Sequence, residues 1–253
     1  MSLQHADGYA LEARNLTKFF GGVRVLEDIS FAVPVGERLA IIGPNGAGKT
    51  TLLNMINGQI SPTAGKIFLF GRDITNLPTH RRAHIGQARS FQLSSLFGKL
   101  SVMENTYLVL HGLEKSRWDM ARSVRRYRSI REKAEQVVRD AGLWARRNEP
   151  VGALAYGDQR RLEINLCMAT DPKLLLLDEP SNGLTKEEGI QVIDMINEHI
   201  GRDVTVLVVA HDMELVFQVA DRIMVLFEGE IIACDSCDIV RCDPRVQEIY
   251  IGA

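Results

Sequence analysis

The sequence lacks any apolar run near the roughly 20 residues that a helix needs to cross a bilayer. Its first ten residues, MSLQHADGYA, have no basic flank followed by an apolar core, so we expect no secretory signal. The formal net charge is only −2, which argues against binding to nucleic acid. We therefore expect a cytoplasmic protein, which can still dock on a membrane partner.

Cysteine is also scarce, with four residues in 253. Cys167 lies in an apolar, helix-like stretch and is expected in the core. Cys234, Cys237 and Cys242 cluster in ACDSCDIVRC, but no histidine lies near them as a fourth ligand, so a zinc site is only a minor alternative. Reduced thiols are the default in the cytosol. No linker rich in Pro, Gly or Ser divides the chain, which predicts one domain.

What the chain does contain is an alternation of strands and helices. Short apolar runs at residues 38–43, 173–178 and 204–210 are typical of buried strands. They predict an α/β fold around a mostly parallel sheet, with the first strands forming a smaller antiparallel element. The last strands read as a hairpin that turns at Glu228-Gly229. The arginine-rich middle of the chain, about 94–147, is predicted to be helical and solvated, and attraction to lipid headgroups or to an acidic patch on a partner is the lesser alternative.

Several helix ends are marked locally. The stretch SVME, from Ser101 to Glu104, fits a capping box, in which a hydroxyl starts the helix and a carboxylate follows three residues later. TKEE, from Thr185 to Glu188, predicts a second box of this kind. Gly58 is the expected stop of the helix that follows residue 50.

The segment GPNGAGKT, from Gly43 to Thr50, fits the pattern G-x-x-x-x-G-K-[ST] of a phosphate-binding loop. Its glycines let backbone N–H groups converge on phosphate oxygens at the start of a helix. Lys49 is expected to reach the β- and γ-phosphates, and Thr50 to offer its hydroxyl to Mg²⁺. A buried strand before the loop and a helical pattern after it are the context that such a loop requires.

A second part of such a site follows in LLLLDE. Asp178 stands at a strand end, where a carboxylate can hold Mg²⁺ through its hydration shell, and Glu179 can polarise the attacking water. The acid pair could instead cap a helix, but the phosphate-binding loop favours a nucleotide site. These two motifs admit kinases, GTPases and helicases. The absence of a guanine-reading NKxD argues against a GTPase.

The segment LAYGDQRRLEI, from Leu154 to Ile164, about twenty residues before Asp178, resembles the signature sequence of ABC-type ATPases. Other motifs of that family follow in order. Phe20, before two glycines, matches the aromatic that stacks on adenine. Gln92 closes ARSFQ and matches the glutamine that reaches Mg²⁺ and the attacking water, and SNGLT after Pro180 matches the D-loop. His211 matches the switch histidine at the γ-phosphate.

The resemblance covers essentially the whole chain. It implies a single P-loop NTPase domain of ABC type over residues 1–253, with a helical signature subdomain inserted at about 94–160. It also implies that the chain binds ATP and Mg²⁺, with Glu179, His211 and Gln92 in catalysis and Thr50, Gln92 and Asp178 at the metal. The residues expected at the chain's own ATP are Phe20, Gly43, Pro44, Asn45, Gly46, Ala47, Gly48, Lys49, Thr50 and Thr51. Those expected at a partner chain's ATP are Ala155, Tyr156, Gly157 and Asp158.

Three stretches are similar to the ATP-binding subunits of branched-chain amino acid importers: ARSFQ, GDQRRLEI and the terminal DPRVQEIYIGA. This likeness implies a motor that pairs with a second ATP-binding subunit, identical or not, at the cytoplasmic face of the inner (plasma) membrane. It implies permease subunits docked in a groove near Gln92 and, indirectly, a periplasmic or extracellular substrate-binding protein. The alternatives are a lipid or lipopolysaccharide exporter motor and an ATPase of iron–sulfur assembly. A nucleotide-binding module without turnover is disfavoured by Glu179.

The signature departs from the family at Ala155, where a serine is usual. That serine donates a hydrogen bond to the partner's γ-phosphate, and a hydrogen bond to a charged group is worth about 1.5–3 kcal/mol. Gly157 and the backbone N–H groups at the helix start remain. We therefore expect Ala155 to moderate dimer closure and to leave the enzyme active.

Overall fold

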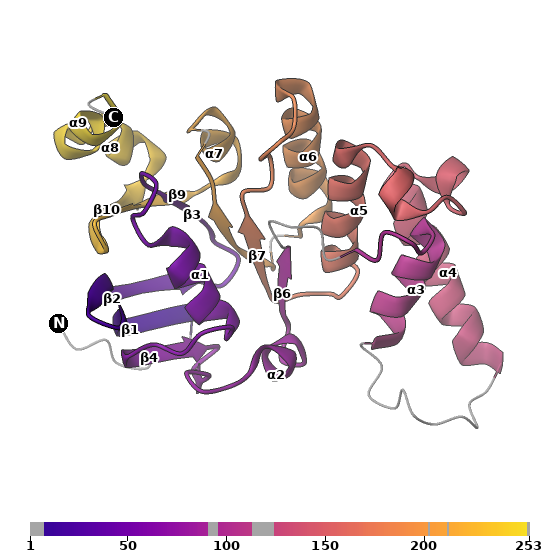
Figure 1. Ribbon diagram of the computed structural model, residues 1–253, viewed down its shortest axis with the longest axis horizontal. Coiled ribbons are helices and arrows are strands. Elements are labelled where there is room, and N and C mark those ends of the chain that lie inside the picture. Colours follow the sequence, from indigo (N-terminus) through magenta and orange to yellow (C-terminus); the bar gives the residue numbers. More distant parts are fainter. Residues whose placement is uncertain (1–7, 91–95, 113–123, 202, 212, 252–253) are drawn as a thin grey trace. The chain divides into compact units, whose positions relative to one another are not determined.

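The protein is described by a computed structural model, which covers residues 8–90, 96–112, 124–201, 203–211 and 213–251 (Figure 1). The chain forms two compact units. The first takes the residues up to Arg89, Lys173–Pro180 and the residues from Ile200 onward, and the second takes Ser90–Pro172 and Ser181–His199. The expected single domain with an insertion at about 94–160 remains a prediction.

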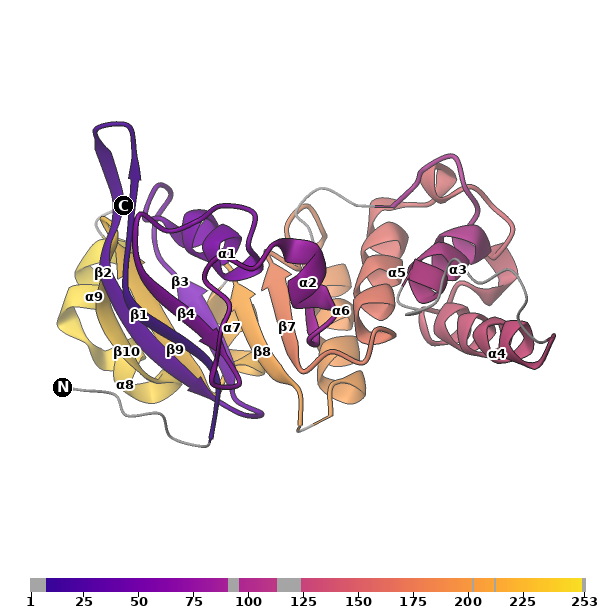
Figure 2. The same cartoon turned by 90° about the horizontal axis from the view of Figure 1, so that it is seen from below.

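The first unit begins with an antiparallel sheet. Its strands are β1 (Tyr9–Phe20), β2 (Val23–Pro34), β4 (Ala64–Leu69) and β5 (Arg72–Asp73), in the order β2-β1-β4-β5. In β2, Ile29, Phe31 and Val33 are buried and alternate with less buried neighbours, as a half-buried strand requires. The expected antiparallel element is therefore confirmed, and the tip of the β1–β2 hairpin is clearly visible in Figure 2.

The second sheet of this unit is mostly parallel. Its strands are β3 (Arg38–Ile42), β6 (Gln87–Ser90), β7 (Leu174–Asp178), β8 (Thr205–Val209), β9 (Arg222–Phe227) and β10 (Glu230–Ser236), in the order β10-β9-β3-β8-β7-β6. β3 runs parallel to both β8 and β9, and β7 runs parallel to β8. β10 returns antiparallel to β9 through Glu228 and Gly229, both at positive φ, which confirms the predicted hairpin.

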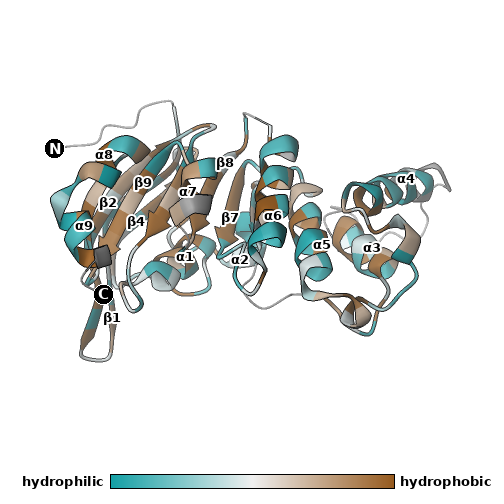
Figure 3. Ribbon diagram, turned by 90° about the horizontal axis from the view of Figure 1, so that it is seen from above, coloured by the Kyte–Doolittle hydropathy of each residue, from teal (hydrophilic) through white to brown (hydrophobic). Residues whose placement is uncertain are grey.

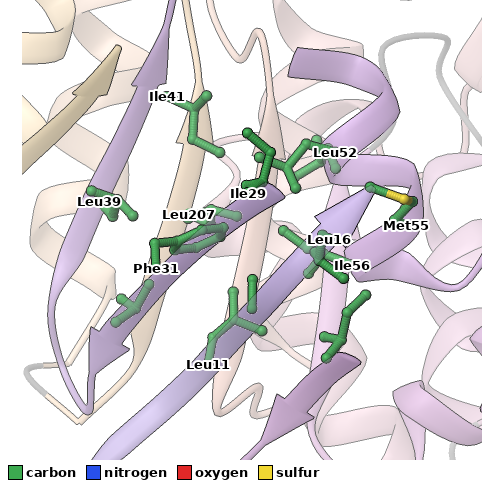
Figure 4. Packing of buried hydrophobic residues seen from close by; sticks show 14 of the residues in the cluster. Leu11, Leu16, Ile29, Phe31, Leu39, Ile41, Leu52, Met55, Ile56 and Leu207 are labelled. Atoms are coloured by element: carbon green, nitrogen blue, oxygen red, sulfur yellow. The ribbon is translucent and has the colours of Figure 1, made fainter. Parts of the chain in front are cut away.

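The helices of the first unit are α1 (Lys49–Asn57), α2 (Thr79–Ala83), α7 (Met213–Val219), α8 (Cys237–Cys242) and α9 (Pro244–Ile251). Apolar residues of α1 pack with residues of both sheets in one buried cluster, part of which Figure 4 shows around Leu52 and Phe31. This packing fixes α1 against the strand that precedes it. Gly58 ends α1 in the left-handed region, φ 78°, and so confirms the predicted helix stop.

Arg82, in α2, is buried beneath the end of α1. Its guanidinium donates hydrogen bonds to the carbonyl oxygens of Met55 and Ile56, at 2.9 and 2.6 Å, in the last turn of α1. It also donates to Leu77 at 2.6 Å and to Thr75 at 3.1 Å. The cation therefore satisfies carbonyls that a helix end leaves open, and its charge suits the negative end of the helix dipole.

The second unit is helical. It contains α3 (Val102–Gly112), α4 (Val124–Asp140), η1 (Trp144–Arg146), η2 (Val151–Ala153), α5 (Tyr156–Met168) and α6 (Lys186–His199). Apolar residues of α3, α4 and α5 form its buried cluster, and the hydrophilic colour along α4 in Figure 3 marks a largely polar helix. Within the described ranges, every helix is too short or too polar to span a lipid bilayer.

Both predicted capping boxes are present in this unit. The amide of Glu104 donates to the Ser101 hydroxyl at 3.2 Å, and the amide of Ser101 donates back to the Glu104 carboxylate at 2.7 Å. Thr185 and Glu188 repeat the arrangement at the start of α6, at 3.2 and 2.9 Å. Cys167 lies in α5, where burial of its thiol, with a smaller contribution from Glu163, raises the pKa to about 12.

Candidate functional site

The parallel strands bring the predicted catalytic side chains of the first unit to one sheet edge. β3, β8 and β7 are consecutive neighbours, and Val209 at the end of β8 is level with both Ile41 in β3 and Asp178 in β7. The loop from Gly43, the acid Asp178 and the residues after Val209 all leave these strands at their carboxyl ends. Ligand sites of open α/β sheets lie at this edge.

The loop after β3 can be built only with glycine at two positions. A side chain at Gly43, where φ is 151°, would place its Cβ 2.0 Å from the carbonyl oxygen of Leu226. At Gly48, φ is 100° and a Cβ would lie 2.6 Å from the side chain of Leu26. Gly48 is also the N-cap of α1, with no side-chain cap and no acid in the first turn. The helix start thus presents backbone donors without a competing acid, as an anion site needs.

Lys49, the first residue of α1, turns back over this loop. Its ammonium donates hydrogen bonds to the carbonyl oxygens of Gly43, at 2.6 Å, and Pro44, at 2.9 Å. Burial lowers the pKa of Lys49, while the nearby charges of Glu179 and Asp178 act in the opposite direction. The electrostatic influence of both acids on this lysine places all three charges in one site.

Glu179 and His211 are in direct contact. The Oε1 of Glu179 lies 2.6 Å from the Nε2 of His211, and the glutamate side chain is largely buried while the histidine is exposed. Glu179 also adopts a positive φ of 46°, and its amide donates to the carbonyl of Val209 at 2.8 Å. A left-handed, non-glycine residue is strained, and such strain gathers at functional sites. The hydrogen bond to β8 holds the glutamate in this conformation.

Phe20 stands at the tip of the β1–β2 hairpin. The residue is about half exposed, at 49%, so it is not a core residue. The Lys18 ammonium lies 4.9 Å from the ring centroid, and Gly21 occupies the turn at φ 57°. The ring is thus open to stacking by a planar ligand, which is the feature that the predicted adenine contact requires.

The signature residues lie in the second unit, at the start of α5. Ala155 is the N-cap and makes no side-chain cap, and Tyr156 is exposed. Asp158, in the first turn, accepts a hydrogen bond from Arg146 at 2.8 Å and pairs with Arg161. A Cβ at Gly157 would lie 2.8 Å from the Glu188 carboxylate, which the capping box of α6 already holds. Glycine is therefore needed for this helix start to approach α6.

Gln92 lies outside the described residues, so its predicted contact with Mg²⁺ and water has no counterpart in the structure. Asn45, Gly46, Thr50 and Thr51 are at least partly exposed on the loop and the first turn of α1, whereas Ala47 is buried. The residue that sequence reasoning missed is Arg89, which is buried and pairs with Asp178 at 2.7 Å. It is part of ARSFQ, but a single arginine in a short polar strand carries no signal of burial.

The residues at this edge fit a magnesium nucleotide. Mg²⁺ takes oxygen ligands and is usually held by one or two carboxylates together with phosphate oxygens and water. Thr50 supplies an exposed hydroxyl and Asp178 a buried carboxylate. The glycine loop, the helix start and the Lys49 ammonium supply donors for phosphates. These metal ligands and phosphate donors all belong to the first unit.

Comparison with known proteins gives a family. A family profile described as ABC transporter matches residues 26–182. The chain is 37% identical to the high-affinity branched-chain amino acid transport ATP-binding protein BraF of Pseudomonas aeruginosa, over 96% of this chain and 97% of that protein. It is 34% identical to the corresponding protein LivG of Escherichia coli, with the same coverage. It is also 34% identical to the lipopolysaccharide export system ATP-binding protein LptB of Acidithiobacillus ferridurans, over 96% of each chain.

Solved structures agree. The ADP conformation of an ATP-binding cassette from an ABC transporter superposes with a TM-score of 0.83 at 29% identity, covering 97% of this chain and 99% of that chain. A dimeric cassette in a post-hydrolysis state, bound to ADP and phosphate, gives a TM-score of 0.76 at 25% identity, covering 90% and 98%.

Proposed function

Because the chain belongs to the ABC transporter family and is an ATP-binding cassette of the ATPase type, we propose that it is the motor subunit of an importer. The proposed cargo is a branched-chain or other hydrophobic amino acid. The names of BraF and LivG and their identity over nearly the full length of both chains support this cargo.

The contact between Glu179 and His211, at the same sheet edge as the glycine loop, is the observation that carries the catalytic proposal. Glu179 accepts a proton from the attacking water, and His211 holds that carboxylate by its Nε2 and contacts the γ-phosphate. Lys49 and the backbone donors of the loop stabilise the charge on the phosphates. Thr50 and Asp178 would hold Mg²⁺, which would supply positive charge against the phosphate oxygens. Gln92 is proposed to orient the water.

Two chains act together in this proposal. The start of α5 from one chain covers the γ-phosphate bound by the loop of the other, through the backbone N–H groups around Gly157. Phe20 stacks on the adenine of its own chain's ATP. Closure excludes bulk water and completes the set of hydrogen-bond donors around the γ-phosphate. Hydrolysis then reopens the pair. The dimeric cassette that was solved with ADP and phosphate supports pairing of this kind.

The proposed partners outside the pair are the permease subunits. Their proposed docking site includes Gln92, and they would place the chain at the cytoplasmic face of the inner (plasma) membrane as a peripheral subunit. A substrate-binding protein acts on the far side of the permease and determines the cargo. No contact with nucleic acid is part of the proposal.

A lipopolysaccharide or other lipid export motor is the second candidate. The likeness to LptB, at 34% identity over 96% of both chains, favours it. The importer ranks first because BraF is more similar and because the terminal YIGA matches the importer group.

Phosphate release tests the catalytic assignment. Purified wild-type protein with ATP and Mg²⁺ is compared with Glu179→Gln, which keeps the size of the side chain and removes its basicity. We expect the variant to bind ATP as the wild type does and to release phosphate at least 100-fold more slowly, within the range that general-base catalysis contributes. Equal rates in the two proteins would defeat the assignment of Glu179.

A further inference from the structure

Arg89 is a buried cation next to the proposed magnesium carboxylate. It lies in β6, directly before residues 91–95, and its side chain is only 6% exposed. Its Nη2 donates to the Oδ2 of Asp178 at 2.7 Å, and the Asp178 side chain is 2% exposed. A charge pair this well shielded from water acts in a low dielectric, where its geometry matters most.

The other arm of the guanidinium is fixed as well. Nη1 donates to the Oδ1 of Asn54 and to the Oε1 of Gln59, both at 2.7 Å. Asn54 lies in α1, the helix that begins at Lys49, and Gln59 follows the end of that helix. One side chain therefore ties β7 to the phosphate-binding helix. The planar fork of arginine can make these contacts together, whereas the compact ammonium of lysine cannot.

We propose that Arg89 is a positioning residue, which orients the Asp178 carboxylate toward Mg²⁺. A carboxylate has two oxygens with about four acceptor positions, so a bond from Arg89 to Oδ2 orients the group without occupying Oδ1. Because Asn54 and Gln59 hold the guanidinium from the side of α1, the carboxylate is set relative to the loop that binds the phosphates. This role rests on the proposed function, in which Asp178 serves the metal.

The alternative is a purely structural role, in which the ion pair of Arg89 and Asp178 only links β6, β7 and α1. Both roles predict some loss of stability when Arg89 is replaced. The two roles differ in metal binding. If the role is only structural, replacing Arg89 leaves the affinity for a divalent ion unchanged, provided that the variant is folded and binds nucleotide. Partners that orient a metal ligand typically change metal affinity by 10–100-fold.

The test measures Mn²⁺ binding by electron paramagnetic resonance, with ATP bound to Glu179→Gln protein so that the nucleotide stays intact. Arg89→Met in this background is expected to bind Mn²⁺ about 10-fold more weakly than the Glu179→Gln protein with Arg89 intact. The Mn²⁺ affinity of Arg89→Lys is expected to lie between the affinities of these two proteins. Arg81→Met, an exposed arginine on α2, is the matched control and is expected to change nothing. ATP binding in EDTA, without metal, is expected to stay within about twofold in every variant.

Unchanged Mn²⁺ affinity in Arg89→Met would overturn the proposal, and so would an equal loss of metal-free ATP binding, which marks general damage. If Arg89→Met does not fold, the double variant Asn54→Ala, Gln59→Ala keeps the charge pair and removes only the anchors. It is expected to weaken Mn²⁺ binding about threefold, less than loss of the arginine itself, and no change would overturn the proposal. Asp178→Asn distinguishes failure of the proposed function from failure of the role of Arg89. If Asp178→Asn leaves the Mn²⁺ affinity unchanged, the proposed metal role of Asp178 is wrong, whatever the Arg89 variants show.

Discussion

At the scale of single residues, two buried arginines organise the first unit. Arg82 has no carboxylate among its four hydrogen-bond acceptors, which are all backbone carbonyls, and burial lowers its pKa to about 10. Its pKa still keeps it charged at neutral pH. Arg89 instead pairs with an acid, Asp178. Both side chains contact α1 or the residues just after it, so the phosphate-binding helix is held by cations at its far end.

Replacing Arg82 by methionine tests the importance of the first of these contacts. The variant keeps much of the side chain's length but removes the guanidinium donor from the carbonyls of Leu77 and Thr75. The carbonyls of Met55 and Ile56 also lose this donor, but they still accept from the Gly58 amide, at 3.1 Å, and from the Gln87 Nε2, at 3.3 Å. A buried acceptor left without a partner costs about 1–3 kcal/mol, and partial rearrangement makes ~3 kcal/mol in total a reasonable expectation. Urea unfolding measures it. Arg81→Met, on the exposed side of α2, should change the free energy of unfolding by less than about 0.5 kcal/mol.

That expectation fails if the two variants unfold at the same urea concentration. Such a result would mean that water replaces the guanidinium at the end of α1 at little cost.

At the scale of elements, the features that could be predicted from the sequence are those that depend on interactions between residues close together in the chain. The capping boxes at Ser101 and Thr185 and the stop at Gly58 depend on neighbours within four residues, and all three are confirmed. β6 was not predicted, because its four residues, of which only Ala88 is apolar, show neither an apolar run nor a clear alternation. The burial of Arg89 depends on β7 and α1, which are distant in sequence, so no local pattern reveals it.

Ala155 has a consequence for its own helix as well as for a partner's ATP. It is the N-cap of α5 and provides no side-chain acceptor, while Asp158 stands three residues later as in a capping box. Ala155→Ser should therefore add a hydrogen bond to the first turn and raise the free energy of unfolding by about 1 kcal/mol. Thermal unfolding without nucleotide measures this effect apart from any ATP contact. Ala153→Ser, just outside the helix, is the control, and equal melting temperatures for the two would contradict the capping role.

At the scale of the whole molecule, the sequence predicted the class of the site, an ABC-type ATPase, but not the contacts between the residues of that site. The order of motifs indicated an ABC-type ATPase, and the family profile and full-length relatives confirm that. The meeting of β3, β8 and β7 at one edge follows from the order of these parallel strands, which the sequence patterns do not specify. The 2.6 Å contact between Glu179 and His211 likewise depends on the pairing of β7 with β8. The roles of the individual site residues remain predictions.

In the proposed mechanism, two chains close over two ATP molecules, and the start of α5 of each chain completes the site of the other. Sedimentation equilibrium of Glu179→Gln protein with ATP and Mg²⁺ tests this directly, with ADP as the control nucleotide. We expect a particle of two chains that holds one ATP per chain, and a single chain with ADP. We also expect Ala155→Ser in this background to shift the equilibrium toward the pair, by one or two powers of ten at most for each of the two ATP sites, about 1.5–3 kcal/mol per site. A single chain at saturating ATP, in protein whose wild type hydrolyses ATP, would contradict this mechanism.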